Sequence, residues 1–401
     1  MDTDKEKLRG KLILAFGMTL FAIGQSLLFI VVAPLAQEIG MSPQTFGIIL
    51  GVSNIPLLIA APMWGKYSDK VGRRPVFIIG LLGSGSGTLL VALALQGAIS
   101  GWYSIAWIGF AFGLSRAYYS ATGSAIYPAS TAYMADVTER SQRAQGMALI
   151  GGANSMGSIL GPLIGGGLAA FSLLFPMYII GFMTLGGALI AYFFLKEPTR
   201  HADTRSKVST LKFTDPRLRP FLILWSTFFL AFIALNVITA FYITAKFGIT
   251  DPPEVAATAG WALLTLAVVI TVAQGLVFQV FKPSPTLLVK LFGPIYAISF
   301  LIIGFAPSVT VLYMGYAVLG LAFAFATPGI NGAASLAVEP HEQGTAGGYL
   351  AAANTSGAIL GPLLGPFLFE IQPNLPMLAA AGLFGILSIY ALTIKVAKHD
   401  D

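Results

Sequence analysis

The sequence predicts an all-α membrane protein with twelve transmembrane helices in two pseudo-symmetric bundles of six. The first observation is composition: of 401 residues, 56% are hydrophobic and only 10% are charged, and the mean hydropathy is +0.80. Soluble domains carry about 25% charged residues, so a soluble core does not explain this chain. The second observation is a repeat within the chain, and the third is the placement of its basic residues.

The repeat pairs residues 153–165 with residues 353–365, which are identical at nine of thirteen positions. In the first copy, three glycines fall on one face of a helix, where the missing side chains let a neighbouring helix approach closely. A proline between them removes a backbone donor and bends the helix. We therefore expect both copies to be helix-packing segments, with Gly157, Gly161, Pro162 and Gly165 in the first and Gly357, Gly361 and Pro362 in the second.

Twelve apolar segments meet the roughly 20-residue length that a spanning helix needs. The first covers residues 12–36, and it is too long for a signal peptide, whose apolar region has about 7–15 residues. The acidic residues before it also differ from the basic start of a signal peptide. The predicted helices centre near Gln25, Ile55, Gly85, Tyr118, Ser155 and Leu185, and then near Ala231, Leu266, Ser299, Leu321, Ser356 and Leu387.

The longest hydrophilic interruption is the polar and basic stretch 196–219. It separates the two sets of six helices. The predicted domains are an N-terminal bundle over 1–195, a linker over 196–219 and a C-terminal bundle over 220–401.

Basic residues are strongly one-sided in this arrangement. All but two of the 23 Lys and Arg residues fall on the side that holds the N-terminus, the linker and the C-terminus. The exceptions are Arg116, inside the fourth helix, and Lys246, on the far side. By the positive-inside rule both termini are predicted to be cytoplasmic. The net charge of +6 then reflects orientation, and no nucleic-acid partner is expected.

Residue content also bears on catalysis. There is no cysteine, and the three histidines, His201, His341 and His399, fall in polar connections or the tail. A glycine-rich run over residues 83–87 lies inside an apolar helix without the lysine of a phosphate-binding loop. We expect no enzyme, no metal site and no cofactor.

The loop between the second and third helices, GKYSDKVGRR over residues 65–74, resembles the G-x-L-a-D-r-x-G-r-r loop of the major facilitator superfamily. Residues 157–166 resemble that superfamily's antiporter motif, G-x-x-x-G-P-x-x-G-G, which points to the drug:proton antiporter branch. Tyr67 and Ser68 depart from the loop pattern. The resemblance covers the whole chain and implies a multi-pass protein of the bacterial inner membrane.

The resemblance also implies a gate built from Gly65, Asp69, Gly72, Arg73 and Asp136. Asp69 would meet the N-terminus of the eleventh helix, where free N–H groups stabilise a carboxylate. Arg73 would pair with Asp136 at the end of the fourth helix. The alternative is a solvated basic loop that only sets topology.

Arg116 is the one charge predicted near mid-membrane, where insertion costs about 2.5–3.5 kcal/mol. It resembles the arginine of the family's fourth-helix motif, although Tyr119 and Ser120 replace the usual glutamine and glycine. It is either fixed at a helix bend by backbone carbonyls or faces a central cavity. The cavity model assigns substrate binding to Arg116 together with Gln25, Tyr119, Tyr127, Asn154, Asn236, Asn331 and Asn354; Asn54, Tyr118 and Gln274 are further polar candidates.

The resemblance implies a secondary active transporter, expected to be a monomer, that exports a small amphipathic molecule by alternating access. Protons are the candidate counter-ion. Many proton-coupled relatives carry an acid in helices one and seven, where this chain has Gln25 and Asn236. A dedicated exporter or uniporter of an anionic or zwitterionic metabolite, siderophore-like or a carboxylate, therefore stays open. A membrane enzyme and a non-transporting receptor are the other classes considered.

Overall fold

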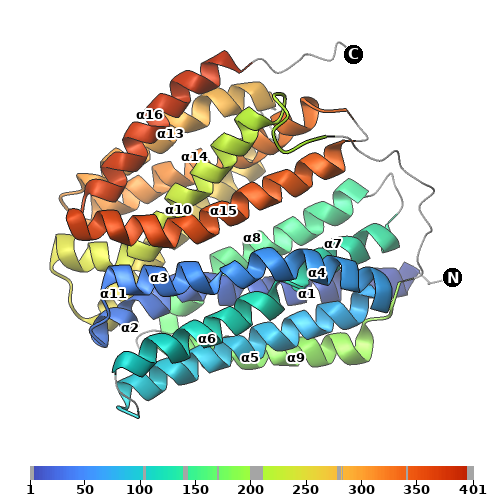
Figure 1. Cartoon of the computed structure of the whole chain (residues 1–401), viewed down its shortest axis with the longest axis horizontal. Helices are drawn as coiled ribbons and strands as arrows, with labels where there is room; N and C mark the ends of the chain where they lie inside the picture. Colours follow the sequence, from blue (N-terminus) through green and yellow to red (C-terminus); the bar gives the residue numbers. More distant parts are fainter. Residues whose placement is uncertain are drawn as a thin grey trace. The chain divides into compact units, whose positions relative to one another are not determined.

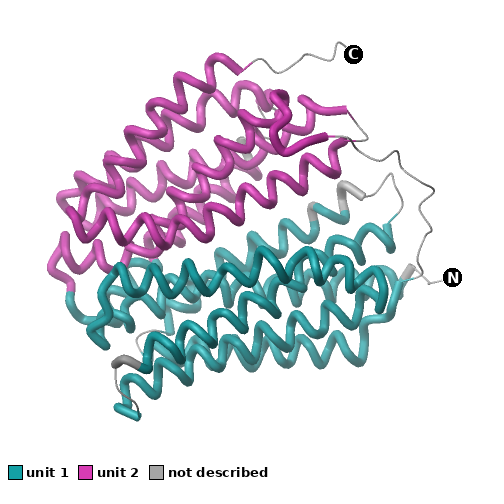
Figure 2. The backbone as a smooth tube through the Cα atoms, viewed as in Figure 1, with its two compact units in different colours: residues 1–203, 250–260 teal, residues 204–249, 261–401 magenta. Residues whose placement is uncertain are grey.

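The computed structural model describes residues 4–102, 105–138, 143–168, 171–198, 211–277, 281, 283–339 and 342–394. Regular structure in these ranges is entirely helical. The chain forms two compact units, shown in Figure 2. Unit 1 comprises residues 1–203 and 250–260, and unit 2 comprises residues 204–249 and 261–401. All twelve sequence-predicted helix centres fall within helices.

The helices of unit 1 follow the chain in Figure 1 from blue to green. They are α1 (Asp4–Leu27), the π-helix η1 (Leu28–Val32), α2 (Ala33–Glu38), α3 (Pro43–Ser53), α4 (Ile55–Val71), α5 (Arg73–Ile99), α6 (Ile105–Gly123), α7 (Ile126–Val137), α8 (Arg143–Leu168) and α9 (Phe175–Phe194).

The remaining helices follow after the linker. They are α10 (Arg219–Phe247), α11 (Pro252–Val272), the π-helix η3 (Ala273–Val277), α13 (Pro285–Gly304), α14 (Val309–Leu336), α15 (Gln343–Ile371) and α16 (Leu375–Thr393). Nine helical stretches of the described chain are long and apolar enough to cross a membrane. The multi-pass fold is thus established, while the count of twelve spans stays a prediction.

Two predicted helices are broken in the structure. Asn54 lies between α3 and α4, and its backbone ends one helix and begins the next. Pro56 follows at the start of α4, where its missing N–H costs nothing. The fourth predicted helix is divided in the same way into α6 and α7. Turn hydrogen bonds hold the backbone at each break, from N of Asn54 to the carbonyl of Gly51 at 3.2 Å and from N of Ala125 to that of Thr122 at 3.1 Å.

The repeated glycine faces hold equivalent positions in the two units. In unit 1, α8 packs on α1, and a Cβ added at Gly157 would lie 2.4 Å from the carbonyl oxygen of Thr19. In unit 2, α15 packs on α10, and a Cβ added at Gly357 would lie 2.6 Å from the backbone nitrogen of Leu230. Backbone thus approaches backbone in both places, and only glycine fits. Gly161, Pro162, Gly165, Gly361 and Pro362 are buried beside them.

A hydroxyl joins each of these helix pairs. Thr19 donates to the carbonyl of Ala153 at 3.1 Å between α1 and α8. Ser226 and Ser356 share a hydrogen bond of 2.7 Å between α10 and α15. Lipid tails are as apolar as leucine, so such close packing and interhelical hydrogen bonds hold membrane helices together more than apolar burial does.

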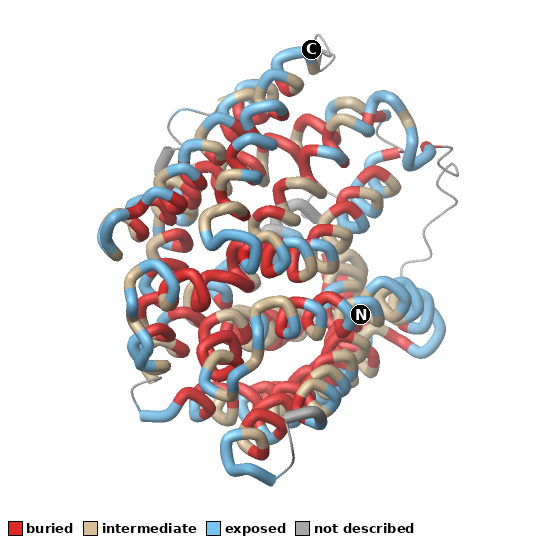
Figure 3. The backbone as a smooth tube through the Cα atoms, turned by 60° about the vertical axis from the view of Figure 1, so that its left-hand side comes forward, coloured by how far each residue is buried: buried red, intermediate tan, exposed pale blue. Residues whose placement is uncertain are grey.

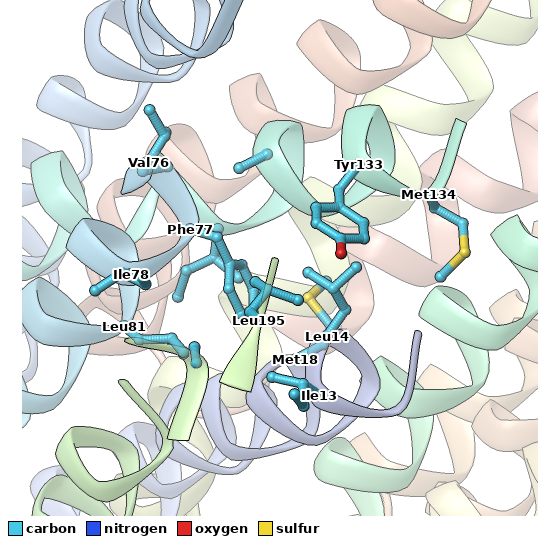
Figure 4. Packing of buried hydrophobic residues seen from close by; sticks show 14 of the residues in the cluster. Ile13, Leu14, Met18, Val76, Phe77, Ile78, Leu81, Tyr133, Met134 and Leu195 are labelled. Atoms are coloured by element: carbon cyan, nitrogen blue, oxygen red, sulfur yellow. The ribbon is translucent and has the colours of Figure 1, made fainter. Parts of the chain in front are cut away.

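Buried residues gather between the helices of each unit, as Figure 3 shows in red. A cluster in unit 1 joins the start of α1 to α5, α7, α8 and α9 (Figure 4). Its fully buried members include Leu14 of α1, Phe77 of α5 and Met134 of α7. The core of unit 2 is aromatic: the Phe228 ring centroid lies 5.0 Å from that of Tyr296 and 4.9 Å from that of Phe323.

Candidate functional site

The turn between α4 and α5 holds an ion-pair cluster centred on Arg73. Its Nε lies 3.1 Å from Oδ2 of Asp136, near the end of α7, and its Nη1 lies 2.5 Å from Oδ1 of Asp69. Nη1 also donates to Oγ of Ser68 at 2.8 Å. One planar guanidinium thus joins the end of α4, the start of α5 and the end of α7. The pair with Asp136 is the one implied by the resemblance.

Gly72 makes this turn possible. Its φ of +114° belongs to a region that L side chains rarely adopt. A Cβ there would also lie 2.7 Å from the carboxylate of Glu197. Gly65 lies in α4, half-buried, and a Cβ there would be 3.9 Å from Cβ of Pro128.

Glu197, which the sequence places in the linker, contacts this turn. Its two carboxylate oxygens accept the first backbone N–H groups of α5, at 2.5 Å from N of Arg73 and 3.0 Å from N of Arg74. A carboxylate at a helix N-terminus satisfies orphan donors and opposes the positive end of the helix dipole. The start of the linker is therefore fastened to the Arg73 turn.

Arg116 is buried in α6, with 4% of its surface exposed. Its Nη2 lies 3.5 Å from the amide oxygen of Asn54, at the break between α3 and α4. Ser120 donates to that same oxygen at 3.1 Å. The guanidinium carbon lies 4.8 Å from the ring centroid of Tyr119, a cation–π distance. Tyr119 in turn stacks on Phe21 of α1, with centroids 6.2 Å apart.

This environment leaves the charge of Arg116 incompletely satisfied. Among the described residues no acidic side chain pairs with it, and its Nε is buried without a hydrogen-bond partner. The acceptor at Asn54 is neutral and distant by hydrogen-bond standards. A buried cation without a counter-ion is costly and is characteristic of functional positions inside membranes. The structure brings Arg116, Tyr119 and Asn54 together.

The other predicted substrate-binding residues are more scattered. In unit 1, Gln25 and Tyr127 are exposed and Asn154 is half-buried. In unit 2, Asn236 donates to the carbonyl of Phe232 at 2.7 Å, and Asn331 donates to that of Thr327 at 2.8 Å. Both amides thus bond within their own helices, which lowers the number of donors free for a ligand. Asn354 is half-buried in α15.

Unit 2 has an ion-pair cluster that sequence reasoning missed. Arg217 lies 3.0 Å from Asp215 and 3.1 Å from the carboxylate of Glu342, which precedes α15. The hydroxyl of Tyr349 donates to the carbonyl of Leu211 at 3.0 Å. Hydrogen bonds from Arg217 hold the pKa of the Asp215 carboxyl below its usual range. The end of the linker is therefore fastened to the start of α15.

Comparison with known proteins identifies the family to which this architecture belongs. The family model described as Major Facilitator Superfamily matches residues 14–295. Multidrug resistance protein 2 of Bacillus subtilis is 28% identical over 398 residues, covering 94% of this chain and 93% of that protein. The class B tetracycline resistance protein of Escherichia coli is 29% identical over 185 residues, covering 45% and 43%.

Solved structures share the fold. A bacterial homologue of the human lysosomal transporter Spinster, in an inward-facing and occupied conformation, superposes with a TM-score of 0.73 at 13% identity. The match covers 98% of this chain and 97% of that one. The motifs, the helical units and these matches agree. The chain belongs to the Major Facilitator Superfamily and is a secondary active exporter similar to its drug:proton antiporter branch, not an enzyme.

Proposed function

We propose that this exporter moves small amphipathic molecules out of the cell by alternating access. The support comes from relatives that cover nearly the whole chain and are named for multidrug resistance. The quinolone resistance protein NorA of Staphylococcus aureus, 23% identical over 383 residues, is a further relative named for drug resistance. The paired glycine faces support the same mechanism, because each half packs as a repeat of the other.

The proposed class of substrate rests on the surroundings of Arg116. Its guanidinium is buried, lacks an acidic partner in the described chain and has an unused donor at Nε. A carboxylate or phosphate of a substrate would supply the missing counter-charge through charge-assisted hydrogen bonds. Tyr119 and Asn54 would position the guanidinium, one by its ring and the other by its amide oxygen.

An anionic or zwitterionic metabolite is the second candidate substrate class. The same unbalanced cation favours it over the lipophilic cations that many drug pumps carry. A panel of matched amphipathic anions, zwitterions and cations, measured for efflux from proteoliposomes, separates the two candidates. Export of anions that is lost in Arg116→Gln supports the metabolite class. Equal export of cations by wild type and Arg116→Gln supports multidrug efflux with a structural arginine.

Proton exchange is proposed from the antiporter motif and needs an acid to carry the proton. Every acidic residue in the described helices lies within one turn of a helix end, as Glu38, Asp136 and Glu370 illustrate. Coupling would then run through a helix-end carboxylate rather than a mid-membrane one. Efflux with and without an imposed pH gradient tests this, and an unchanged rate would mean another driving ion or none.

We further propose a monomer in the bacterial inner membrane with both termini cytoplasmic. The one-sided basic residues support this orientation. The chain has no cysteine, so single cysteines introduced at Lys212 and Thr250 report sidedness without background. A membrane-impermeant maleimide applied to intact cells should label the cysteine introduced at Thr250 and should not label the one at Lys212. Light scattering of the detergent-solubilised protein tests the monomer.

A further inference from the structure

A surface groove of unit 1 runs between the start of α1 and the end of α9. Its volume is about 420 Å³. Leu12, Phe16 and Ile190 form apolar walls and are all more than one-third exposed. The floor is Ile13, which is 9% exposed and belongs to the core of the unit. The groove is thus built on fixed packing.

Two cations stand at one end of this groove. Lys5 and Arg9 are one helical turn apart on the same face of α1. Within the described residues neither has an acidic partner, because the neighbouring Glu6 lies 2.5 Å from Nζ of Lys196 instead. The guanidinium of Arg9 lies 4.4 Å from the ring centroid of Phe194, which holds it at the rim.

The cationic and apolar groups of the groove are arranged in the order in which a membrane changes from its polar interface to its apolar interior. Along α1 the cations come in the first two turns, and the apolar Leu12 and Phe16 follow toward the helix middle. Helix α9 ends at the same level with Tyr192 and Phe194, and aromatic residues of this kind mark the membrane interface. Cations at the interface above an apolar channel match a phosphate headgroup above an acyl chain.

The helix ends that form the groove are held together. The Glu6–Lys196 pair joins α1 to the residues that follow α9, and the hydroxyl of Tyr133, in the neighbouring helix α7, donates to the carbonyl of Lys196 at 2.9 Å. Deeper along the contact, a Cβ at Gly187 would lie 2.9 Å from Cδ1 of Leu20, so α9 approaches α1 closely there. The concave shape therefore does not depend on an occupant.

We infer that this groove binds one anionic phospholipid, with its phosphate against Lys5 and Arg9 and an acyl chain along Leu12, Phe16 and Ile190. Basic pockets between membrane helices at the interface bind anionic headgroups in this way. The lipid would bridge α1 and α9, and would thereby stabilise the helix on which the Gly157 face packs. The site lies apart from Arg116 and does not depend on the substrate assignment.

Native mass spectrometry of the purified full chain tests the site, with phosphatidylglycerol and phosphatidylcholine of equal chain length as probes. Wild type should retain phosphatidylglycerol preferentially. Lys5→Gln with Arg9→Gln should weaken that binding at least about tenfold, because two interfacial cations are lost. The matched control is Lys7→Gln with Lys11→Gln, which removes two charges from the same segment outside the groove. The control should bind as wild type does.

A second variant tests the acyl channel. Leu12→Trp should obstruct it and lower phosphatidylglycerol binding while keeping both cations. Leu392→Trp, on the exposed face of α16, is its control. If the variant with Lys5→Gln and Arg9→Gln does not fold, Leu12→Trp provides the test in its place. Equal losses in both double variants would show diffuse attraction and overturn the site. Equal binding of phosphatidylcholine, or competition by soluble glycerol phosphate at equal strength, would overturn it as well.

Discussion

Arg73 and Asp136 are joined at 3.1 Å between Nε and Oδ2, while the same guanidinium reaches Asp69 at 2.5 Å. The two acids differ in their surroundings. The Asp136 side chain is 17% exposed, and that of Asp69 is 63% exposed. Asp136 therefore anchors Arg73 inside unit 1, and we propose that the more exposed Asp69 serves in gating.

This difference in exposure predicts different effects of replacing each aspartate by asparagine. Asp136→Asn should lower stability by about 1–3 kcal/mol, because it removes the less exposed of the two carboxylates that pair with the largely buried Arg73 guanidinium. Asp69→Asn should cost no more than about 1 kcal/mol, since exposed ion pairs contribute little, yet it should reduce transport. Thermal unfolding in detergent and flux in proteoliposomes measure both effects. Wild-type flux in Asp69→Asn would leave the loop with only a topological role.

The glycine faces predict a position-dependent cost of added side chains. Gly157→Ala and Gly357→Ala place a methyl group against the backbone of the neighbouring helix and should destabilise by about 1–3 kcal/mol. Gly161→Leu and Gly361→Leu should abolish transport. Gly167→Ala in α8 and Gly347→Ala in α15 are the controls, because a Cβ at either meets nothing within 4 Å. Thermal stability equal across all four alanine variants would contradict the packing seen here.

Arg116 predicts graded effects of substitution. Arg116→Lys keeps the charge but loses the planar fork and should weaken export of an anionic substrate partially. Arg116→Gln should abolish it while the solubilised protein still unfolds cooperatively. Asn54→Ala should lower apparent affinity more than maximal rate, since it only releases the guanidinium from its amide acceptor. If Arg116→Gln does not fold, the arginine is structural, as the alternative at a helix bend expects.

The Asp215–Arg217–Glu342 cluster predicts a pH dependence of stability. Because hydrogen bonds from Arg217 lower the pKa of Asp215 in the folded chain, the ionised carboxylate favours folding. That contribution is present above the unfolded pKa of about 4 and is lost as the pH falls through the lower folded pKa. Thermal stability of wild type should therefore fall more steeply below about pH 4 than that of Asp215→Asn. Parallel curves would show that the ion pair adds nothing.

Local patterns in the sequence account for much of this structure. Each long apolar run predicted a segment whose centre falls within a helix, and the glycine spacing at residues 157–165 identified a close helix contact. The pairing of Arg73 with Asp136 followed from a family resemblance. Each of these depends on residues near one another in the chain or on a motif.

Other features depend on which segments meet in three dimensions. By sequence Glu197 is only a linker residue. The packing of α9 on α5 is what brings its carboxylate to the start of α5. The break at Asn54 is marked in the sequence only by Pro56, which by itself does not distinguish the end of a helix from a bend. The pair between Arg217 and Glu342 joins segments 125 residues apart. No periodicity in the sequence reports such contacts.

Flux measured in proteoliposomes tests the central claim of secondary active export most directly. Purified chain is reconstituted without nucleotide, and a panel of amphipathic anions and cations is followed with and without an imposed pH gradient. The account predicts gradient-driven accumulation of at least one class above protein-free liposomes, and its loss in Gly161→Leu. Folded protein that gives no gradient-driven flux for any member of the panel, or flux that requires nucleotide, would contradict it.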